Sequence, residues 1–126
     1  MPRPRSKTLT DAELRLMEAL WELGPATVAE VVEALPKQEK VAYNTVLTTL
    51  RILEDKGYVA HKQRGRAFVY EALVGRDQAR RSTVRHLMNK FFDNSPAALV
   101  LNVLENEQID EEELERLRAL IDRRTS

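Results

Sequence analysis

Residues 41–70 read VAYNTVLTTLRILEDKGYVAHKQRGRAFVY, and this stretch decides the fold of the chain. Its first half has apolar residues at Val46, Leu50 and Leu53, the i, i+4, i+7 spacing of one helix face. Gly57 stands where a left-handed residue would close such a helix. The pattern therefore predicts a helix that buries a single apolar stripe and ends at the glycine.

The second half of the stretch is predicted to form a hairpin of two strands, at residues 59–64 and 66–71. In both segments, successive side chains suit opposite faces of a sheet. Gly65 between them allows a tight turn. The tip of this hairpin is crowded with basic side chains, contributed by Lys62, Arg64 and Arg66.

The face of the helix opposite its apolar stripe carries short polar side chains and one arginine. Amide and hydroxyl groups bond base edges in the major groove, and a guanidinium bonds guanine or phosphate. A helix that contacts base edges in a DNA groove, beside a basic hairpin that binds the phosphate backbone, is the winged-helix arrangement. We therefore expect DNA to be contacted by Tyr43, Asn44, Thr45, Thr48, Arg51, Lys62, Arg64 and Arg66.

Two more helices are expected before the reading helix, and each begins with a capping box. TDAE at residues 10–13 opens a helix that ends near Leu23. TVAE at residues 27–30 opens a short helix that Pro36 stops. The reading helix has a weak start, because Ala42 stands where Ser, Thr or Asp would cap it. Three helices followed by a hairpin make a helix-turn-helix with a wing.

The composition is that of a helix-rich globular protein. Of the 126 residues, 43% are hydrophobic and 32% charged, and none is cysteine. The lack of cysteine removes disulfide scaffolds, zinc knuckles and thiol catalysis. The chain has neither an 18-residue apolar run nor the apolar core of a signal peptide near its start. We therefore expect a cytoplasmic protein with no direct membrane insertion.

The charges sum to zero, yet they are sorted along the chain. Residues 9–36 hold six acidic residues and one basic, whereas residues 37–70 hold seven basic and three acidic. A short basic arm is expected at residues 2–7. Most charge runs are only solvated faces, but this one coincides with the segment expected to read a groove. Local charge therefore favours DNA binding despite the neutral total.

Three helices are expected in the remainder of the chain, at residues 76–92, from Ser95 and Pro96 onward, and after Asp110. Residues 76–126 are too few to bury their apolar side chains alone, so a partner subunit is the economical solution. A two-fold dimer would also read a palindromic operator. The dimer interface is expected to contain Leu87, Phe91, Leu99, Leu101, Leu104, Leu114, Leu117 and Ile121.

The predicted fold is therefore mainly α-helical with a small β-hairpin wing. A winged helix-turn-helix DNA-binding domain is expected at residues 1–75, and a helical dimerisation region at residues 76–126. An enzyme is not expected, because the two histidines, His61 and His86, have no metal-binding or catalytic spacing around them. A serine nucleophile elbow is also missing from the sequence.

Four stretches of the chain resemble the penicillinase repressor family of bacterial winged-helix regulators (BlaI, MecI, CopY). They are LTDAELRLMEALWELGPATVAEVVEAL, NTVLTTLRILEDKGYV, GRAFVYEALV and SPAALVLNVLENEQIDEEELERLRALID. The resemblance implies a homodimeric repressor with C-terminal helices interlocked between subunits. Members of the antibiotic-resistance type are inactivated when a membrane sensor protease triggers cleavage in the dimerisation region. The matching stretch makes Asn102 and Val103 the candidate cleavage site.

The chain departs from the family pattern at several positions. Copper-responsive members bind metal through C-terminal cysteines; this chain has none, and Cu(I) prefers thiolates, so no metal or cofactor is expected. Ala42, Asn44 and Leu47 stand where Ser, Lys and Lys are expected in β-lactam-responsive members, which bears on the operator sequence. Val103 stands where a Phe is expected at the cleavage site.

Two alternative functions remain open at the level of the sequence. A winged helix can bind protein and act as an interaction adaptor, but it would not need the polar helix face and the basic wing tip together. A winged-helix repressor can also be relieved by a small-molecule ligand, which requires a cavity.

Overall fold

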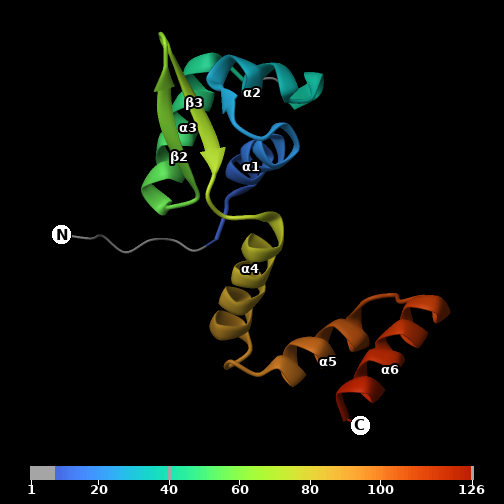
Figure 1. Cartoon of the computed structure of the whole chain (residues 1–126). Helices are drawn as coiled ribbons and strands as arrows, with labels where there is room; N and C mark the ends of the chain where they lie inside the picture. The colour runs from blue at the N-terminus through green and yellow to red at the C-terminus, as the bar shows by residue number, and fades with distance from the viewer. Residues whose placement is uncertain (1–7, 40, 126) are drawn as a thin grey trace. The chain divides into compact units, whose positions relative to one another are not determined.

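The computed structural model describes residues 8–39 and 41–125. The chain forms two compact units, of which the first ends at His86 and the second begins at Leu87 (Figure 1). Helix α4 (Arg76–Phe91) contains this division, whereas the domain boundary expected from the sequence falls at the start of that helix. The expected basic arm at residues 2–7 lies outside the described residues.

The first unit consists of helices packed on a small antiparallel sheet. Its elements before α4 are α1 (Asp11–Leu23), β1 (Ala26–Thr27), α2 (Val28–Ala34), a 3-10 turn η1 (Lys37–Glu39), α3 (Tyr43–Lys56), β2 (Val59–Arg64) and β3 (Ala67–Ala72). The sheet order is β1-β3-β2. The predicted mainly helical fold with a hairpin wing is confirmed, with β3 beginning one residue later than expected.

The short strand β1 was not predicted from the sequence. It pairs with β3 through Ala26 opposite Tyr70 and Thr27 opposite Val69. Two residues are too few to show the alternation that identifies a strand. The sheet therefore has a third strand that only long-range pairing reveals.

The two predicted capping boxes are both present. The Thr10 hydroxyl accepts from the Glu13 backbone N–H at 3.1 Å, and the Glu13 carboxylate accepts from the Thr10 N–H at 2.9 Å. Thr27 and Glu30 form the same reciprocal pair at 3.1 and 2.8 Å. Each box satisfies backbone donors that a helix start leaves free. These local bonds fix where α1 and α2 begin.

Helix α3 also begins and ends as expected. Ala42 is at its N-cap and makes no side-chain capping bond. Gly57 takes the left-handed conformation at φ 89° and ψ 13°, and the Tyr58 N–H then donates to the Leu53 carbonyl at 2.9 Å. A side chain would be strained at this φ, so the glycine allows the chain to turn directly into β2.

The core of the first unit lies between α1, α2, α3 and the sheet. The largest fully buried side chains are Tyr70, Met17, Leu20, Leu50, Leu53, Val31, Val46 and Val59. The apolar stripe predicted for α3 is thus confirmed as buried. Trp21 packs at the edge of this core, where its indole N–H donates to the Val74 carbonyl at 2.9 Å and the Arg76 guanidinium lies 5.2 Å from the ring centroid. These contacts hold the segment that leaves β3.

A buried ion pair joins the end of α3 to the start of α1. Lys56 Nζ lies 2.7 Å from Glu13 Oε1, and both side chains are largely buried. Lys56 also donates to the Thr8 carbonyl at 3.3 Å. Burial raises the pKa of the Glu13 carboxyl. The hydrogen bonds from Lys56 and Thr10 together lower this pKa by more than burial raises it, so it lies below the ordinary value.

The second unit contains α5 (Pro96–Asn106) and α6 (Glu111–Thr125) after the end of α4. Ser95 caps α5 by accepting from the Ala98 N–H at 3.0 Å, and Asp110 caps α6 by accepting from the Glu113 N–H at 2.8 Å. The predicted starts of both helices are confirmed. Among the described residues of α5 and α6, no side chain is buried.

Replacing Lys56 by Met should destabilise the first unit by about 1–3 kcal/mol at neutral pH, because the Glu13 carboxylate loses its cation in a buried site. Since the pKa of Glu13 is lowered in the folded protein, its contribution is present above the unfolded value of 4.5 and is lost as the pH falls. Unfolding curves of the variant and the parent should therefore converge in acid.

Denaturant unfolding followed by circular dichroism measures both effects. Arg118→Met is the matched control, because it removes an exposed ion pair with Glu115 at 3.3 Å and should change stability little. An equal loss of stability in the two variants at neutral pH would contradict a stabilising role for the buried pair.

Candidate DNA-binding surface

The polar side chains predicted to read DNA lie on one exposed side of α3. Burial of the Val46, Leu50 and Leu53 stripe turns the opposite side of the helix to solvent. Asn44, Thr48 and Arg51 follow each other there at the i, i+4, i+7 spacing. The five predicted residues of the helix are all exposed: Tyr43, Asn44, Thr45, Thr48 and Arg51.

The β2–β3 hairpin stands beside α3, and Figure 1 shows its tip projecting past the helices of this unit. Gly65 at the turn has φ 61°, in the region that favours glycine. Lys62, Arg64 and Arg66 are exposed near this tip. Lys62 Nζ lies 3.7 Å from Glu71 Oε1 and its side chain is 80% exposed, so the ion pair leaves it accessible.

The base of the hairpin is joined to α3 by a cluster of polar and aromatic side chains. His61 Nδ1 on β2 lies 2.8 and 2.9 Å from the two carboxylate oxygens of Glu54 on α3. The His61 ring meets Phe68 edge-on at 5.0 Å between centroids and lies 5.3 Å from the Tyr70 ring. Three side chains of the helix and the hairpin, those of Glu54, Phe68 and Tyr70, thus contact one imidazole.

Tyr70 connects this cluster to Arg51. The Tyr70 side chain is buried, and the Arg51 guanidinium lies near enough to its hydroxyl to affect its pKa. Burial raises the pKa of Tyr70, the nearby Glu54 carboxylate raises it further, and Arg51 opposes the shift. Arg51 is therefore exposed to solvent beside a buried side chain of the core.

The sequence did not indicate the roles of Glu54, His61 and Tyr70. The sequence shows no metal-binding or catalytic spacing around His61 and does not indicate which side chain its imidazole contacts. The contact arises since Gly57 turns the chain back, which brings β2 alongside the last turn of α3. The hairpin register then places His61 opposite Tyr70. A histidine one helix turn and one tight turn after a glutamate is too weak a signal to be read without the fold.

Comparison with known proteins identifies the relatives of this chain. The family model described as penicillinase repressor matches residues 9–123. The chain belongs to the penicillinase repressor family. This finding confirms the resemblance drawn from the four sequence stretches.

Relatives within the penicillinase repressor family match along most of their length. The penicillinase repressor of Bacillus licheniformis is 30% identical over 114 residues, which cover 90% of this chain and 89% of the relative. The methicillin resistance regulatory protein MecI of Staphylococcus aureus (strain N315) is 26% identical over 116 residues, covering 92% and 94%. Both names describe regulators and neither describes an enzyme.

A solved structure matches part of this penicillinase repressor family member. The DNA-binding domain of the repressor BlaI aligns with a TM-score of 0.52 and 29% sequence identity, covering 60% of this chain and 93% of that domain. The similarity confirms the winged-helix fold predicted from the reading helix and the wing.

Apolar side chains of the second unit remain exposed in the single chain. The residues expected at a dimer interface are largely uncovered: Leu87, Phe91, Leu101, Leu104, Leu117 and Ile121 are exposed, and Leu99 and Leu114 are half-buried. Phe91 has 67% of its surface exposed. Such a concentration of uncovered apolar surface marks an interaction site.

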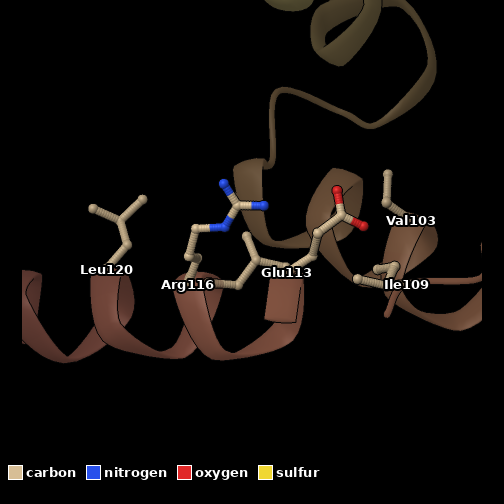
Figure 2. Close-up of a pocket in the computed structure, with 6 residues that line it drawn as sticks. Val103, Ile109, Glu113, Arg116 and Leu120 are labelled. Carbon is tan, nitrogen blue, oxygen red and sulfur yellow. The ribbon is translucent and has the colours of Figure 1, made fainter. Parts of the chain in front are cut away.

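An open hollow of about 480 Å³ lies on the surface between α5 and α6 (Figure 2). Val103 reaches it from α5 and Ile109 from the connection between the helices, while Glu113, Arg116 and Leu120 lie along α6. The lining is mostly apolar with one acidic and one basic side chain. The hollow therefore belongs to the same uncovered surface as the expected dimer residues.

The candidate cleavage site lies within α5. Asn102 and Val103 are exposed, and the Asn102 carbonyl accepts from Asn106 Nδ2 at 2.9 Å in addition to its place in the helix. A protease cleaves an extended segment, so this turn of α5 would have to unwind before cleavage.

Within residues 8–39 and 41–125, the structure has no cluster of three His, Asp or Glu side chains suited to a metal ion. No helix in this same part of the chain is both long and apolar enough to span a membrane.

Proposed function

We propose that this chain is a dimeric winged-helix transcriptional repressor that binds a palindromic double-stranded DNA operator. The observation that carries the proposal is the exposed polar face of α3 beside a basic wing. The names of the relatives, penicillinase repressor and MecI, and the match to the DNA-binding domain of BlaI support it. The protein acts in the cytoplasm, catalyses no reaction and needs no cofactor for this function.

Each subunit would place α3 in the major groove and the wing on the phosphate backbone. A helix fits the width of the major groove, where amide, hydroxyl and guanidinium groups distinguish base pairs. Phosphate contacts by lysine and arginine fix the register of the protein on the duplex. Base edges are read by Asn44, Thr45, Thr48 and Arg51, with Tyr43 beside them, and phosphates are bound by Lys62, Arg64 and Arg66.

The dimer is assigned to residues 76–126, and DNA binding to residues 1–75. The uncovered apolar side chains of α4, α5 and α6 support this division, because a second copy offers the same apolar surface and would cover both. A two-fold dimer presents two reading heads to an inverted repeat. Operator binding then depends on the C-terminal helices even though they touch no DNA.

Repression would be relieved by cleavage between Asn102 and Val103, triggered by a membrane sensor protease. The position supports this, since cleavage there removes α6 and part of α5 from the apolar interface. Relief by a small-molecule ligand is a second alternative, and the hollow between α5 and α6 is open to solvent. A protein-interaction adaptor remains the alternative from another functional class.

Selection of bound sequences from a random duplex library, at roughly physiological salt, tests the proposal directly. The expected product is an inverted repeat with half-sites about one helical turn apart. Absence of enrichment from a protein that is dimeric in solution would favour the adaptor.

Arg51→Ala and Arg64→Ala should have different effects on operator binding. If Arg51 pairs with a guanine, its loss should cost about 1–3 kcal/mol of discrimination at one base position. Loss of Arg64 should weaken binding to all duplexes alike and reduce the salt slope by about one ion. Fluorescence anisotropy with the selected operator and single-base variants, at several salt concentrations, measures both. Equal effects of the two substitutions on discrimination would contradict the assignment of Arg51 to the groove.

Truncation after Asn102 should convert the dimer to a monomer and reduce operator affinity. Leu117→Glu should have the same effect, because a buried carboxylate at the interface is strongly unfavourable. Arg118→Gln is the matched control, since it changes the next side chain on α6, which is 70% exposed. Analytical ultracentrifugation gives the oligomeric state of each protein. A truncated chain that still sediments as a dimer would contradict the assigned interface.

A further inference from the structure

Trp21, near the end of α1, holds the chain where it leaves the sheet and enters α4. Its indole N–H donates to the Val74 carbonyl at 2.9 Å, across 53 positions of sequence. The Arg76 guanidinium lies over its ring, 5.2 Å from the centroid. Both Trp21 and Val74 are partly buried against the core. One side chain of α1 therefore contacts the connection before α4 and the first residue of that helix.

Two further contacts restrain the start of α4 within the first unit. The Leu73 N–H donates to the Tyr58 carbonyl at 2.8 Å, directly after the end of β3. Ala79, in the first turn of α4, is buried in the core with 4% of its surface exposed. Between these points, a Cβ added at Gly75 would meet no atom of the described residues within 4 Å. The connection is thus held at both ends, and the glycine is its least restrained position.

Helix α4 continues from the first unit, which ends at His86, into the second. It contains neither proline nor glycine, which are common causes of a sharp kink. Its 16 residues give it a length of about 24 Å, at roughly 1.5 Å per residue. Leu87 and Phe91, in its last turns, belong to the uncovered apolar surface expected at the dimer interface. The direction of α4 at its start therefore bears on where a dimer places each reading head.

The size of this effect is comparable with the dimensions of DNA. A change of about 10° in the direction of α4 at its start displaces its far end by about 4 Å. One base pair of B-DNA occupies roughly 3.4 Å along the duplex and rotates it by about 35°. A dimer that distinguishes half-site spacings differing by one base pair therefore needs the start of α4 held to within roughly 10°. Backbone torsions at a glycine such as Gly75 vary by more than this, so the connection needs a restraint from another element.

We propose that Trp21 is a positioning residue for operator recognition, which fixes the direction of α4 and thereby the half-site spacing that the dimer accepts. The inference rests on the proposed repressor function and extends it from the base sequence of one half-site to the distance between two. The indole N–H supplies a directional bond, and the Arg76 guanidinium adds an attraction to the face of the ring. Trp21 is not among the residues assigned to contact DNA, so its effect is exerted through α4.

Trp21→Phe tests the inference, because it keeps an aromatic ring against the core and removes the N–H donor. Anisotropy titrations compare the selected operator, two versions with one base pair added or removed between the half-sites, and a duplex with a single half-site. The variant should bind the selected operator about three- to tenfold more weakly, the range that loss of one hydrogen bond covers. Its preference over the altered spacings should fall by the same factor, and its affinity for the single half-site should equal that of the parent.

Arg76→Gln and Arg80→Gln form a matched pair one turn apart on α4. Each removes one positive charge, but Arg76 lies over the Trp21 ring, whereas Arg80 is 70% exposed and pairs with Asp77 at 3.6 Å. Arg76→Gln should relax the spacing preference by about two- to fivefold, the range expected for one cation–π contact. Arg80→Gln should leave that preference unchanged. Circular dichroism and analytical ultracentrifugation establish that each variant is folded and dimeric.

The outcomes distinguish this inference from the function on which it rests. A parent protein that accepts all three spacings alike, or a folded Trp21→Phe variant that keeps the spacing preference, would overturn the inference and leave the repressor proposal intact. An equal loss of affinity on every duplex, the single half-site included, would also overturn it, because such a loss marks a role in the fold alone.

If Trp21→Phe does not fold, the two arginine variants decide. Equal spacing preferences in Arg76→Gln and Arg80→Gln would overturn the inference, and a relaxed preference in Arg76→Gln alone would support it. Failure of the parent protein to prefer any duplex would overturn the repressor proposal, and this inference with it.

Discussion

Burial of one apolar stripe on α3 is the constraint on which the first unit depends. Val46, Leu50 and Leu53 are almost fully removed from solvent, packed among α1, α2 and the sheet. Because a helix has a fixed periodicity, burying this stripe determines the rotation of α3 and leaves its polar face outward. The orientation of Thr48 and Arg51 toward solvent is thus a consequence of core packing and requires no interaction of their own.

Tyr70 carries the same constraint from the core to the wing. It pairs with Ala26 of β1 and His61 of β2, its ring is buried, and its hydroxyl lies near the Arg51 guanidinium. The base of the hairpin is therefore part of the core, whereas its tip is free to carry Lys62 and other charges. A rigid base with an exposed basic tip suits a wing that must reach phosphates at a set distance from the groove.

The second unit shows the opposite relation between local and tertiary structure. Its helix starts are well specified by Ser95 and Asp110, yet none of the described residues of α5 and α6 is buried. Capping bonds can determine where a helix begins, but its stability in a protein comes mainly from covering an apolar face. The apolar faces of these helices are uncovered in the single chain, which is the physical basis for proposing a dimer.

The sequence by itself determined the helices α1 to α6 and the two strands of the hairpin, because their signals are local. Capping boxes at Thr10 and Thr27, the left-handed Gly57 and the apolar stripe of α3 each depend on residues a few positions apart, and so the reading helix and the wing could be predicted. Tertiary structure alone decided the strand β1, the Lys56 to Glu13 pair and the cluster of His61 with Glu54. These contacts join residues whose proximity is set by the packing of whole elements, and no spacing in the sequence encodes them.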